Sequence, residues 1–389
     1  MGNENHAVQH NPILCIVPPH MLDQIAENGT TEQKILAEKT REMTQLMQGQ
    51  RIAVARGEVP SPKTAEPAVA AAKKRLVYTA ANGSTLPGTL VRQEGDPPCN
   101  DAAVDEAFDG AGFTYDLFWN SYQRSSIDNN GMDLISTVHF QRSYDNAFWN
   151  GNQMVYGDGD EDMPEAQRIF NRFTIALDVI GHELTHGVTQ HEANLVYYNQ
   201  SGALNESVSD VFGSLVKQNR RGQNARAADW IIGEGLFTSN INGVGIRSMK
   251  APGTAYDDPL VGKDPQPGHM RDYVNTTQDN GGVHINSGIP NHAFYIAAYE
   301  LNGFAWEKAG AIWYATLTDN RLTSSANFQA FANLTFQIAG EKFGVNSLEQ
   351  QAVRKGWAEV GIDLAAVVEP SGGCLQAVMS LFGPSSSRK

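Results

Sequence analysis

The segment from residue 178 to residue 190, DVIGHELTHGVTQ, constrains this chain most. His182 and His186 are four residues apart, so an α-helix places both imidazoles on one face, about 6 Å apart along its axis. Apolar side chains recur at intervals of three and four residues, which is typical of a buried helical stripe: Phe173, Leu177, Ile180, Leu184 and Val188. The sequence therefore predicts an interior helix whose two histidines face a common point.

Glu206, in the later stretch ALNESVSD, completes a set of metal ligands with His182 and His186. Two histidines and one carboxylate are three protein ligands, and a catalytic zinc ion keeps its remaining position for water. Glu183 stands next to His182, where it can take a proton from that water. The alternative is that both histidines are core residues that only form hydrogen bonds with their neighbours. This alternative assigns no role to Glu183 or Glu206. We therefore predict a hydrolase with one catalytic zinc ion.

Between about Val77 and Gly361 the chain resembles the thermolysin-like zinc metalloproteases of the M4 type, in particular protealysin-like precursors with a short propeptide. The resemblance is carried by DNAFWNGNQMVYGDGD, HELTHGVTQHEANL, GALNESVSDVFG, IRSM and DNGGVHINSGIPNHAFY, in that order. It implies an α+β fold, a two-lobe zincin with a β-rich N-terminal lobe, an α-helical C-terminal lobe and the active-site helix between them. It also implies an endopeptidase that cleaves on the amino side of bulky hydrophobic residues.

The resemblance assigns catalytic roles to residues of this chain. Glu183 is the general base, and His284 and Tyr197 stabilise the oxyanion that forms on the attacked carbonyl. Asp279 holds the ring of His284. Asp210 orients His182, and its position four residues after Glu206 on the same helical face suits that role.

Substrate-binding residues also follow from the resemblance. Asn146 and Ala147 match edge-strand positions that hold an extended peptide. Arg247 matches the residue that holds the substrate carbonyl after the cleaved bond. Apolar residues match the pocket for the side chain that follows this bond: Phe170, Phe173, Val179, Ile232 and Ile246.

The first part of the chain differs from the rest. We expect a propeptide over residues 1–60 with a helix from Glu32 to Met47, begun by a capping box of Thr30 and Gln33. We expect a linker with the processing region over 61–75, catalytic lobes over 76–190 and 191–368, and a disordered tail over 369–389. The alternative for the first segment is a docking tail that stays attached.

By resemblance, Pro18, Pro19 and Leu22 form the motif with which the propeptide covers the active site and acts as an intramolecular inhibitor. Cys15, close to this motif, allows a further hypothesis, because a thiolate can bind zinc and hold the precursor silent. A small cysteine buried in an apolar run explains Cys15 equally well.

Calcium is expected to be lost from the double site of the family. Asp178, Asp229 and Glu234 occupy matching places, but Lys217 and Ile231 stand where two further carboxylates are expected. Calcium requires six to eight oxygen ligands, and an ammonium group can neutralise the remaining acids instead. A second calcium loop is also altered, with Val244 in place of an acid.

Composition limits the partners. A net charge of −14 disfavours binding to nucleic acid, and no apolar run of membrane-spanning length occurs.

The resemblance implies secretion, but the first 30 residues show no secretory signal pattern, so we expect another export route or a cytoplasmic precursor. Three cysteines are too few for a disulfide framework. We expect a monomer that acts on protein or peptide substrates.

Three rival functions stay open. A zinc aminopeptidase shares HExxH and a downstream glutamate, but it needs an anchor for a free amino terminus. A catalytically silent binding protein could use the same scaffold, although Glu183, Glu206 and His284 are intact. A structural zinc protein is disfavoured by the open fourth position.

Overall fold

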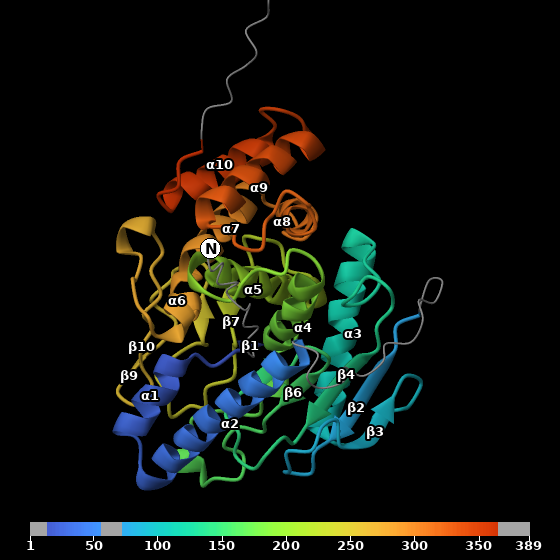
Figure 1. Ribbon diagram of the computed structural model, residues 1–389, viewed down its shortest axis with the longest axis vertical. Helices are drawn as coiled ribbons and strands as arrows, with labels where there is room; N and C mark the ends of the chain where they lie inside the picture. The colour runs from blue at the N-terminus through green and yellow to red at the C-terminus, as the bar shows by residue number, and fades with distance from the viewer. Residues whose placement is uncertain (1–13, 56–71, 365–389) are drawn as a thin grey trace, which may run out of the picture.

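A six-stranded mixed sheet forms the N-terminal lobe (Figure 1). The computed structural model describes residues 14–55 and 72–364. The sheet order is β1-β5-β6-β4-β2-β3. Its strands are β1 (Leu14–Cys15), β2 (Arg75–Thr79), β3 (Thr89–Gln93), β4 (Leu134–Val138), β5 (Ala147–Trp149) and β6 (Met154–Tyr156). β2, β4 and β6 run parallel, whereas β3 and β5 pair antiparallel with their neighbours.

Helix α3 (Ala102–Tyr122) packs against β2 and β4 and against the helices that carry the site. Asp101 caps its start by accepting hydrogen bonds from the backbone N–H groups of Ala103 and Val104, at 3.1 and 3.3 Å. Such a cap satisfies backbone donors that the first helical turn leaves unpaired.

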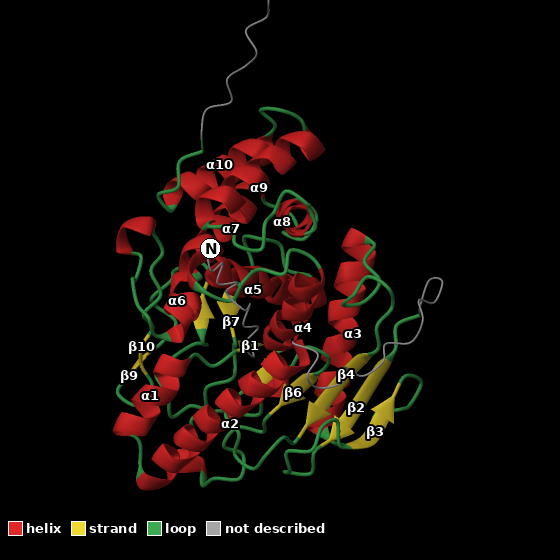
Figure 2. Cartoon of the chain, in the orientation of Figure 1, coloured by secondary structure: helices red, strands yellow, loops and turns green. Residues whose placement is uncertain are grey.

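The C-terminal lobe is helical (Figure 2). α4 (Leu177–His191) and α5 (Asn199–Arg221) occupy the middle of the molecule, between the sheet and the remaining helices (Figure 1). Those are α6 (Asp279–Asn286), α7 (Gly288–Leu301), α8 (Ala309–Leu317), α9 (Phe328–Phe343) and α10 (Leu348–Glu359). Two small antiparallel pairs, β7 (Ile231–Ile232) with β8 (Arg247–Ser248) and β9 (Asp257–Asp258) with β10 (Gly262–Lys263), lie in the connections. The predicted α+β architecture is confirmed.

The N-terminal segment consists of β1, α1 (Pro19–Asn28) and α2 (Thr31–Ala55). Pro19 is the first residue of α1, where its missing N–H costs nothing. The predicted capping box is present, because Gln33 N–H donates to Thr30 Oγ1 at 3.3 Å and Thr30 N–H donates to Gln33 Oε1 at 2.8 Å. α2 continues to Ala55, eight residues beyond the predicted end at Met47.

The expected domain boundaries are described only in part. Lys73 and Lys74 pair with Asp116 and Asp133 of the sheet lobe, and Arg75 is the first residue of β2, so the end of the expected linker belongs to the catalytic body. The rest of the linker, up to residue 71, and the expected tail over 369–389 lie outside the described residues.

Candidate metal centre and active site

α4 and α5 approach each other closely because glycines face each other at their contact. A Cβ on Gly213 of α5 would lie 2.3 Å from the carbonyl oxygen of Asp178 and 2.9 Å from the backbone nitrogen of His182. A Cβ on Gly181 of α4 would lie 3.0 Å from the Cα of Gly213. Only glycine leaves room for this approach, which brings the side chains of one helix to those of the other.

The predicted ligands meet at this contact. His182, His186 and Glu206 each offer an atom within 4.8 Å of the others, and all three side chains are fully buried. The His182 and His186 Nε2 atoms are 2.9 Å apart. Glu206 carboxylate oxygens lie 3.5 Å from His182 Nε2 and 3.4 Å from His186 Nε2. Ligands of a tetrahedral zinc ion are about 3.3 Å apart when the bonds are about 2.0–2.2 Å long, so the three atoms fit one such ion.

The hydrogen bonds of the two rings support a cation between them. His182 Nδ1 lies 2.8 Å from Asp210 Oδ1, and His186 Nδ1 lies 2.8 Å from Asn205 Oδ1. Since both partners are acceptors, both protons are on Nδ1 and both Nε2 lone pairs point at the same place. Glu206 Oε2 is buried there and has no hydrogen-bond partner among the described residues. Converging lone pairs and a buried carboxylate are stabilised by a metal ion.

Asp210 is held from several sides. Arg247 donates to its two oxygens, from Nε and Nη2, at 2.8 Å each, and Asn291 Nδ2 donates to Oδ2 at 2.8 Å. Burial disfavours the charged carboxylate, but Arg247 and His182 outweigh this and lower the pKa of Asp210. An ionised Asp210 keeps the proton of His182 on Nδ1.

Glu183 lies between the ligand cluster and the sheet edge. Its Oε2 accepts a hydrogen bond from the backbone N–H of Trp149 in β5, at 3.1 Å, and its side chain is fully buried. The predicted base is therefore fixed beside β5, the strand with which β1 of the N-terminal segment pairs.

His284 and Tyr197 lie together beside Glu206. Tyr197 Oη lies 3.1 Å from His284 Nε2 and donates a hydrogen bond to Glu206 Oε1. Asp279 Oδ1 lies 2.6 Å from His284 Nδ1. Burial opposes a charge on the ring, but Asp279 and Glu206 outweigh it and raise the pKa of His284 to about 9. Residues 280–282 of α6 have positive φ angles, and this kink turns His284 toward the cluster.

Comparisons with known proteins agree with this geometry. Residues 30–190 match the family model of the thermolysin metallopeptidase catalytic domain, and residues 193–362 match that of its α-helical domain. The chain belongs to the thermolysin family of metallopeptidases. An extracellular metalloprotease of Pectobacterium carotovorum subsp. carotovorum is 52% identical over 92% of this chain and 99% of its own length. A thermolysin of Alicyclobacillus acidocaldarius subsp. acidocaldarius is 40% identical over 74% of this chain and 50% of its own length.

A solved structure gives the same result at the level of the fold. The precursor of protealysin, a metalloproteinase from Serratia proteamaculans, superposes on this chain with a TM-score of 0.79 and is 51% identical in sequence. The match covers 90% of this chain and 99% of the protealysin precursor chain. The chain is a metalloendopeptidase of a zinc-dependent family, and its histidine and glutamate cluster can hold the metal. Among the described helices, none combines the length and apolar character needed to cross a membrane.

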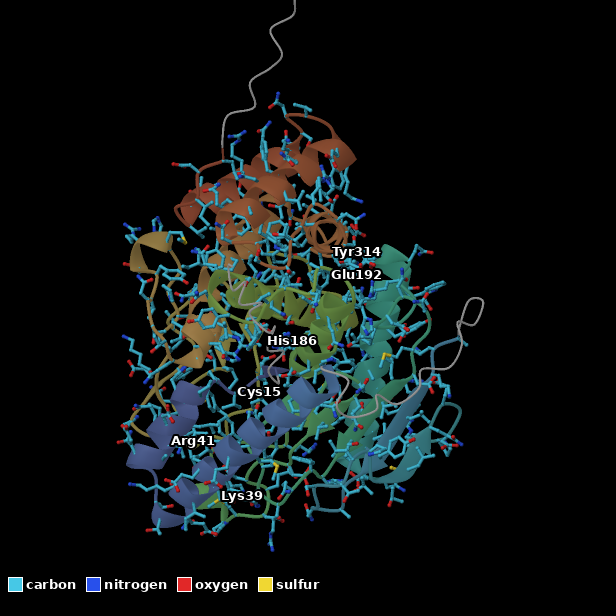
Figure 3. All side chains as sticks on the ribbon, viewed as in Figure 1. Cys15, Lys39, Arg41, His186, Glu192 and Tyr314 are labelled. Atoms are coloured by element: carbon cyan, nitrogen blue, oxygen red, sulfur yellow. The ribbon has the colours of Figure 1, made fainter. Side chains whose placement is uncertain are left out.

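The N-terminal segment of this thermolysin-family chain lies in the site. β1 pairs antiparallel with β5, with Leu14 opposite Trp149 and Cys15 opposite Phe148. Asn146 and Ala147, predicted to hold a peptide, contact residues 16 and 17 of the chain's own N-terminal segment. Figure 3 marks Cys15 of this segment and His186 of α4 in the central part of the molecule.

The motif predicted to cover the site directly follows the residues that meet the predicted catalytic groups, and its inhibitory role stays a prediction. Pro18 is the buried residue before α1, Pro19 begins that helix, and Leu22 is buried on it. The groups that meet His284 and Arg247 belong instead to Cys15 and Ile16. The strand before the prolines, rather than the prolines themselves, lies against the predicted catalytic residues.

The structure gives no support to the hypothesis that the Cys15 thiolate binds the metal, which stays untested. Its Sγ is not among the atoms that converge on the cluster, and its side chain packs with the apolar residues Phe140, Tyr144, Phe148 and Val155. Burial raises the pKa of the Cys15 thiol well above its usual value.

The residues predicted to line the apolar pocket are all buried within one contiguous apolar cluster: Phe170, Phe173, Val179, Ile232 and Ile246. The sidechain of Ile16 belongs to the same cluster and is fully buried. Their assignment as a substrate pocket stays a prediction.

An ammonium group occupies the place where the resemblance predicts a double calcium site. Lys217 Nζ lies 2.9 Å from Asp178 Oδ2 and 2.8 Å from Asp229 Oδ1, and it donates to the carbonyl of Ile231 at 2.6 Å. The guanidinium of Arg221 lies 2.7 Å from Glu234. Loss of calcium stays a prediction, and these contacts give it a physical basis.

Three polar residues around the ligands were not predicted. Asn205 and Ser209 both contact His186 Nδ1, at 2.8 and 2.9 Å, and Asn291 contacts Asp210. Asn205 and Ser209 are four residues apart on the helix that carries Glu206, and this spacing could have indicated them. Nothing in the sequence links Asn291 to Asp210, which is 81 positions away.

Proposed function

We propose that this chain is a zinc endopeptidase that cleaves internal peptide bonds on the amino side of bulky hydrophobic residues and is made as a self-processing precursor. The observation that carries the proposal is the convergence of His182, His186 and Glu206 beside a sheet edge already lined by a peptide segment. When bound, zinc lowers the pKa of a water molecule toward about 7 and polarises a carbonyl oxygen.

The side chains of the chain supply the remaining chemistry. Glu183 takes the proton of the attacking water and passes it to the leaving amine. His284 and Tyr197 donate hydrogen bonds to the oxygen of the attacked carbonyl, where negative charge develops. Asn146, Ala147 and Arg247 hold the peptide in an extended conformation beside β5.

The path of the bound segment favours an endopeptidase over an aminopeptidase. The chain enters the site from residues before Cys15, and Leu14 pairs with Trp149 of β5. An aminopeptidase ends its cleft with an anchor for a free amino group, whereas here Cys15, whose carbonyl meets His284, is preceded by Leu14, which pairs with β5.

We further propose that the N-terminal segment is a propeptide that inhibits the site until it is removed. It is held on the body by Gln33 Nε2, which donates to the carbonyl of Gln167 at 2.8 Å, and by Thr44, whose hydroxyl lies 3.0 Å from Tyr144 Oη. The extracellular metalloprotease among the relatives supports action outside the cell. We expect the mature enzyme to be a monomer.

The test is the Glu183→Ala variant with internally quenched peptides and free aminoacyl substrates. The wild-type chain should cleave the quenched peptides, and Glu183→Ala should reduce kcat/KM by at least about 100-fold. Glu300→Ala, which changes an exposed glutamate paired with Lys355, is the matched control and should keep the activity. Full activity of Glu183→Ala, or cleavage of aminoacyl substrates alone, would refute the proposal.

A further inference from the structure

The N-terminal segment passes through the active site in a defined register. His284 Nε2 lies 3.0 Å from the carbonyl oxygen of Cys15. The next residue, Ile16, donates its N–H to Ala147 O at 3.3 Å and accepts at its carbonyl from Arg247 Nη1 at 3.2 Å. Successive backbone groups of the segment therefore meet successive groups of the site.

Those contacts identify one peptide bond. In the proposed function, on which this inference rests, His284 serves the carbonyl under attack and Arg247 serves the carbonyl that follows the cleaved bond. They hold the carbonyls of Cys15 and Ile16, respectively. We propose that the Cys15–Ile16 bond is a second processing site, which the enzyme hydrolyses within its own cleft, separate from the cut that frees the whole propeptide.

The neighbouring residues suit this register. Ile16 is a branched aliphatic residue, of the class that the proposed specificity places after the cleaved bond, and its side chain is fully buried. Asn146 binds the following residue through both of its polar atoms, since Val17 N–H donates to Oδ1 at 3.0 Å and Nδ2 lies 3.5 Å from Val17 O. The segment is thus held on the amine side of the bond as a substrate would be.

The step is an ordinary hydrolysis. The oxygen of water bonds to the carbonyl carbon of Cys15, and the C–N bond to Ile16 breaks. Glu183 accepts one proton of the water and delivers it to the Ile16 nitrogen. The products are a carboxylate at Cys15 and a new amino terminus at Ile16, with no oxidant or reductant required.

The product that begins at Ile16 is held on the body. Its residues continue into α1 and α2, which are attached through Gln33 and Thr44. The cut should therefore leave a nicked complex whose retained segment begins at Ile16.

The experiment follows the purified full chain with time by intact-mass measurement and N-terminal sequencing. We expect chains that begin at Ile16 and a fragment that ends at Cys15, with a rate independent of protein concentration. Glu183→Ala should yield neither product. Ile16→Leu should keep the cut, whereas Ile16→Asp, which places a charge among apolar side chains, should slow it at least about 10-fold.

A second measurement does not depend on how the variants fold. A synthetic peptide of residues 10–24, added to enzyme that has lost its propeptide, should be cut between Cys15 and Ile16. If this bond stays intact in both the chain and the peptide while an internally quenched peptide is hydrolysed, the inference is wrong and the proposed function stands. If the quenched peptide is also untouched, the proposed function fails as well.

Discussion

Lys217 stands where the family resemblance predicts a calcium-binding carboxylate. Its side chain is 3% exposed, and the Asp178 side chain paired with it is 1% exposed. Burial opposes the charge on the ammonium group, but Asp178 and Asp229 outweigh it and raise the pKa of Lys217. One cation of the protein thus neutralises acids that would otherwise need a metal ion.

Replacement of Lys217 by alanine should be costly, because it leaves Asp178 buried without its counter-ion. We expect a loss of about 3–5 kcal/mol in the free energy of unfolding. The control, Lys308→Ala, removes an ion pair whose lysine is 46% exposed, and it should cost at most about 1 kcal/mol.

Urea unfolding in a Glu183→Ala background, which prevents self-digestion, measures the loss in the free energy of unfolding for both lysine variants. Thermal unfolding with and without calcium is the second measurement, and added calcium should not change the Tm of the chain that keeps Lys217. A calcium-dependent rise in that Tm, or equal losses in the two lysine variants, would contradict this assignment.

His139 connects the end of β4 to two other parts of the sheet lobe. Its Nδ1 lies 2.8 Å from Asp158 after β6, and its Nε2 lies 3.0 Å from Asp101, the cap of α3. The hydrogen bond with Asp158 raises the pKa of His139 from 6.5 to about 9, against partial desolvation.

Because the folded-state pKa is the higher one, His139 should stabilise the fold fully below pH 6.5 and lose this contribution as the pH rises through about 9. His139→Asn, which tolerates the φ of 54° at this position, should therefore reduce the free energy of unfolding more at pH 6 than at pH 10. Unfolding in urea at both pH values, with Glu183→Ala in both chains, measures the two differences. An equal or larger reduction at pH 10 would show that the charge is not responsible.

At the scale of elements, the contact between α4 and α5 decides the geometry of the metal centre. Gly213→Ala would place a Cβ 2.3 Å from the carbonyl of Asp178, so the helices must separate and Glu206 must move away from His182. We expect at least about 10-fold weaker zinc binding, together with lower stability.

Competition with a chelator measures this affinity. Gly268→Ala is the matched control, because a Cβ there meets only Pro252, at 3.6 Å and beyond. Unchanged zinc affinity in Gly213→Ala would show that the two helices do not need this close approach.

The sequence predicted long, strongly periodic elements better than short ones. The apolar stripe around Leu184 and the capping box of Thr30 and Gln33 are local signals, and both are confirmed. β1 has only two residues, and its extended conformation depends on pairing with β5, more than 130 positions away. No local pattern can indicate such a strand.

At the scale of the whole molecule, residues far apart in the chain meet around one buried cluster. The HExxH spacing was sufficient to predict His182 and His186, and the family resemblance supplied Arg247 and Asp279. Neither indicated that Arg247 binds both Asp210 and the carbonyl of Ile16, because this depends on how β8, α5 and the N-terminal segment pack. The predicted catalytic residues and the N-terminal segment are therefore packed into one continuous structure.

The central claim is that His182, His186 and Glu206 together bind one zinc ion. X-ray absorption spectroscopy at the zinc edge, on full-length chain loaded with zinc, tests it most directly. We expect one ion per chain with nitrogen and oxygen ligands at about 2.0–2.2 Å, at least two of them imidazoles, and no sulfur. A sulfur ligand at about 2.3 Å, or a chain that binds no zinc, would contradict the account.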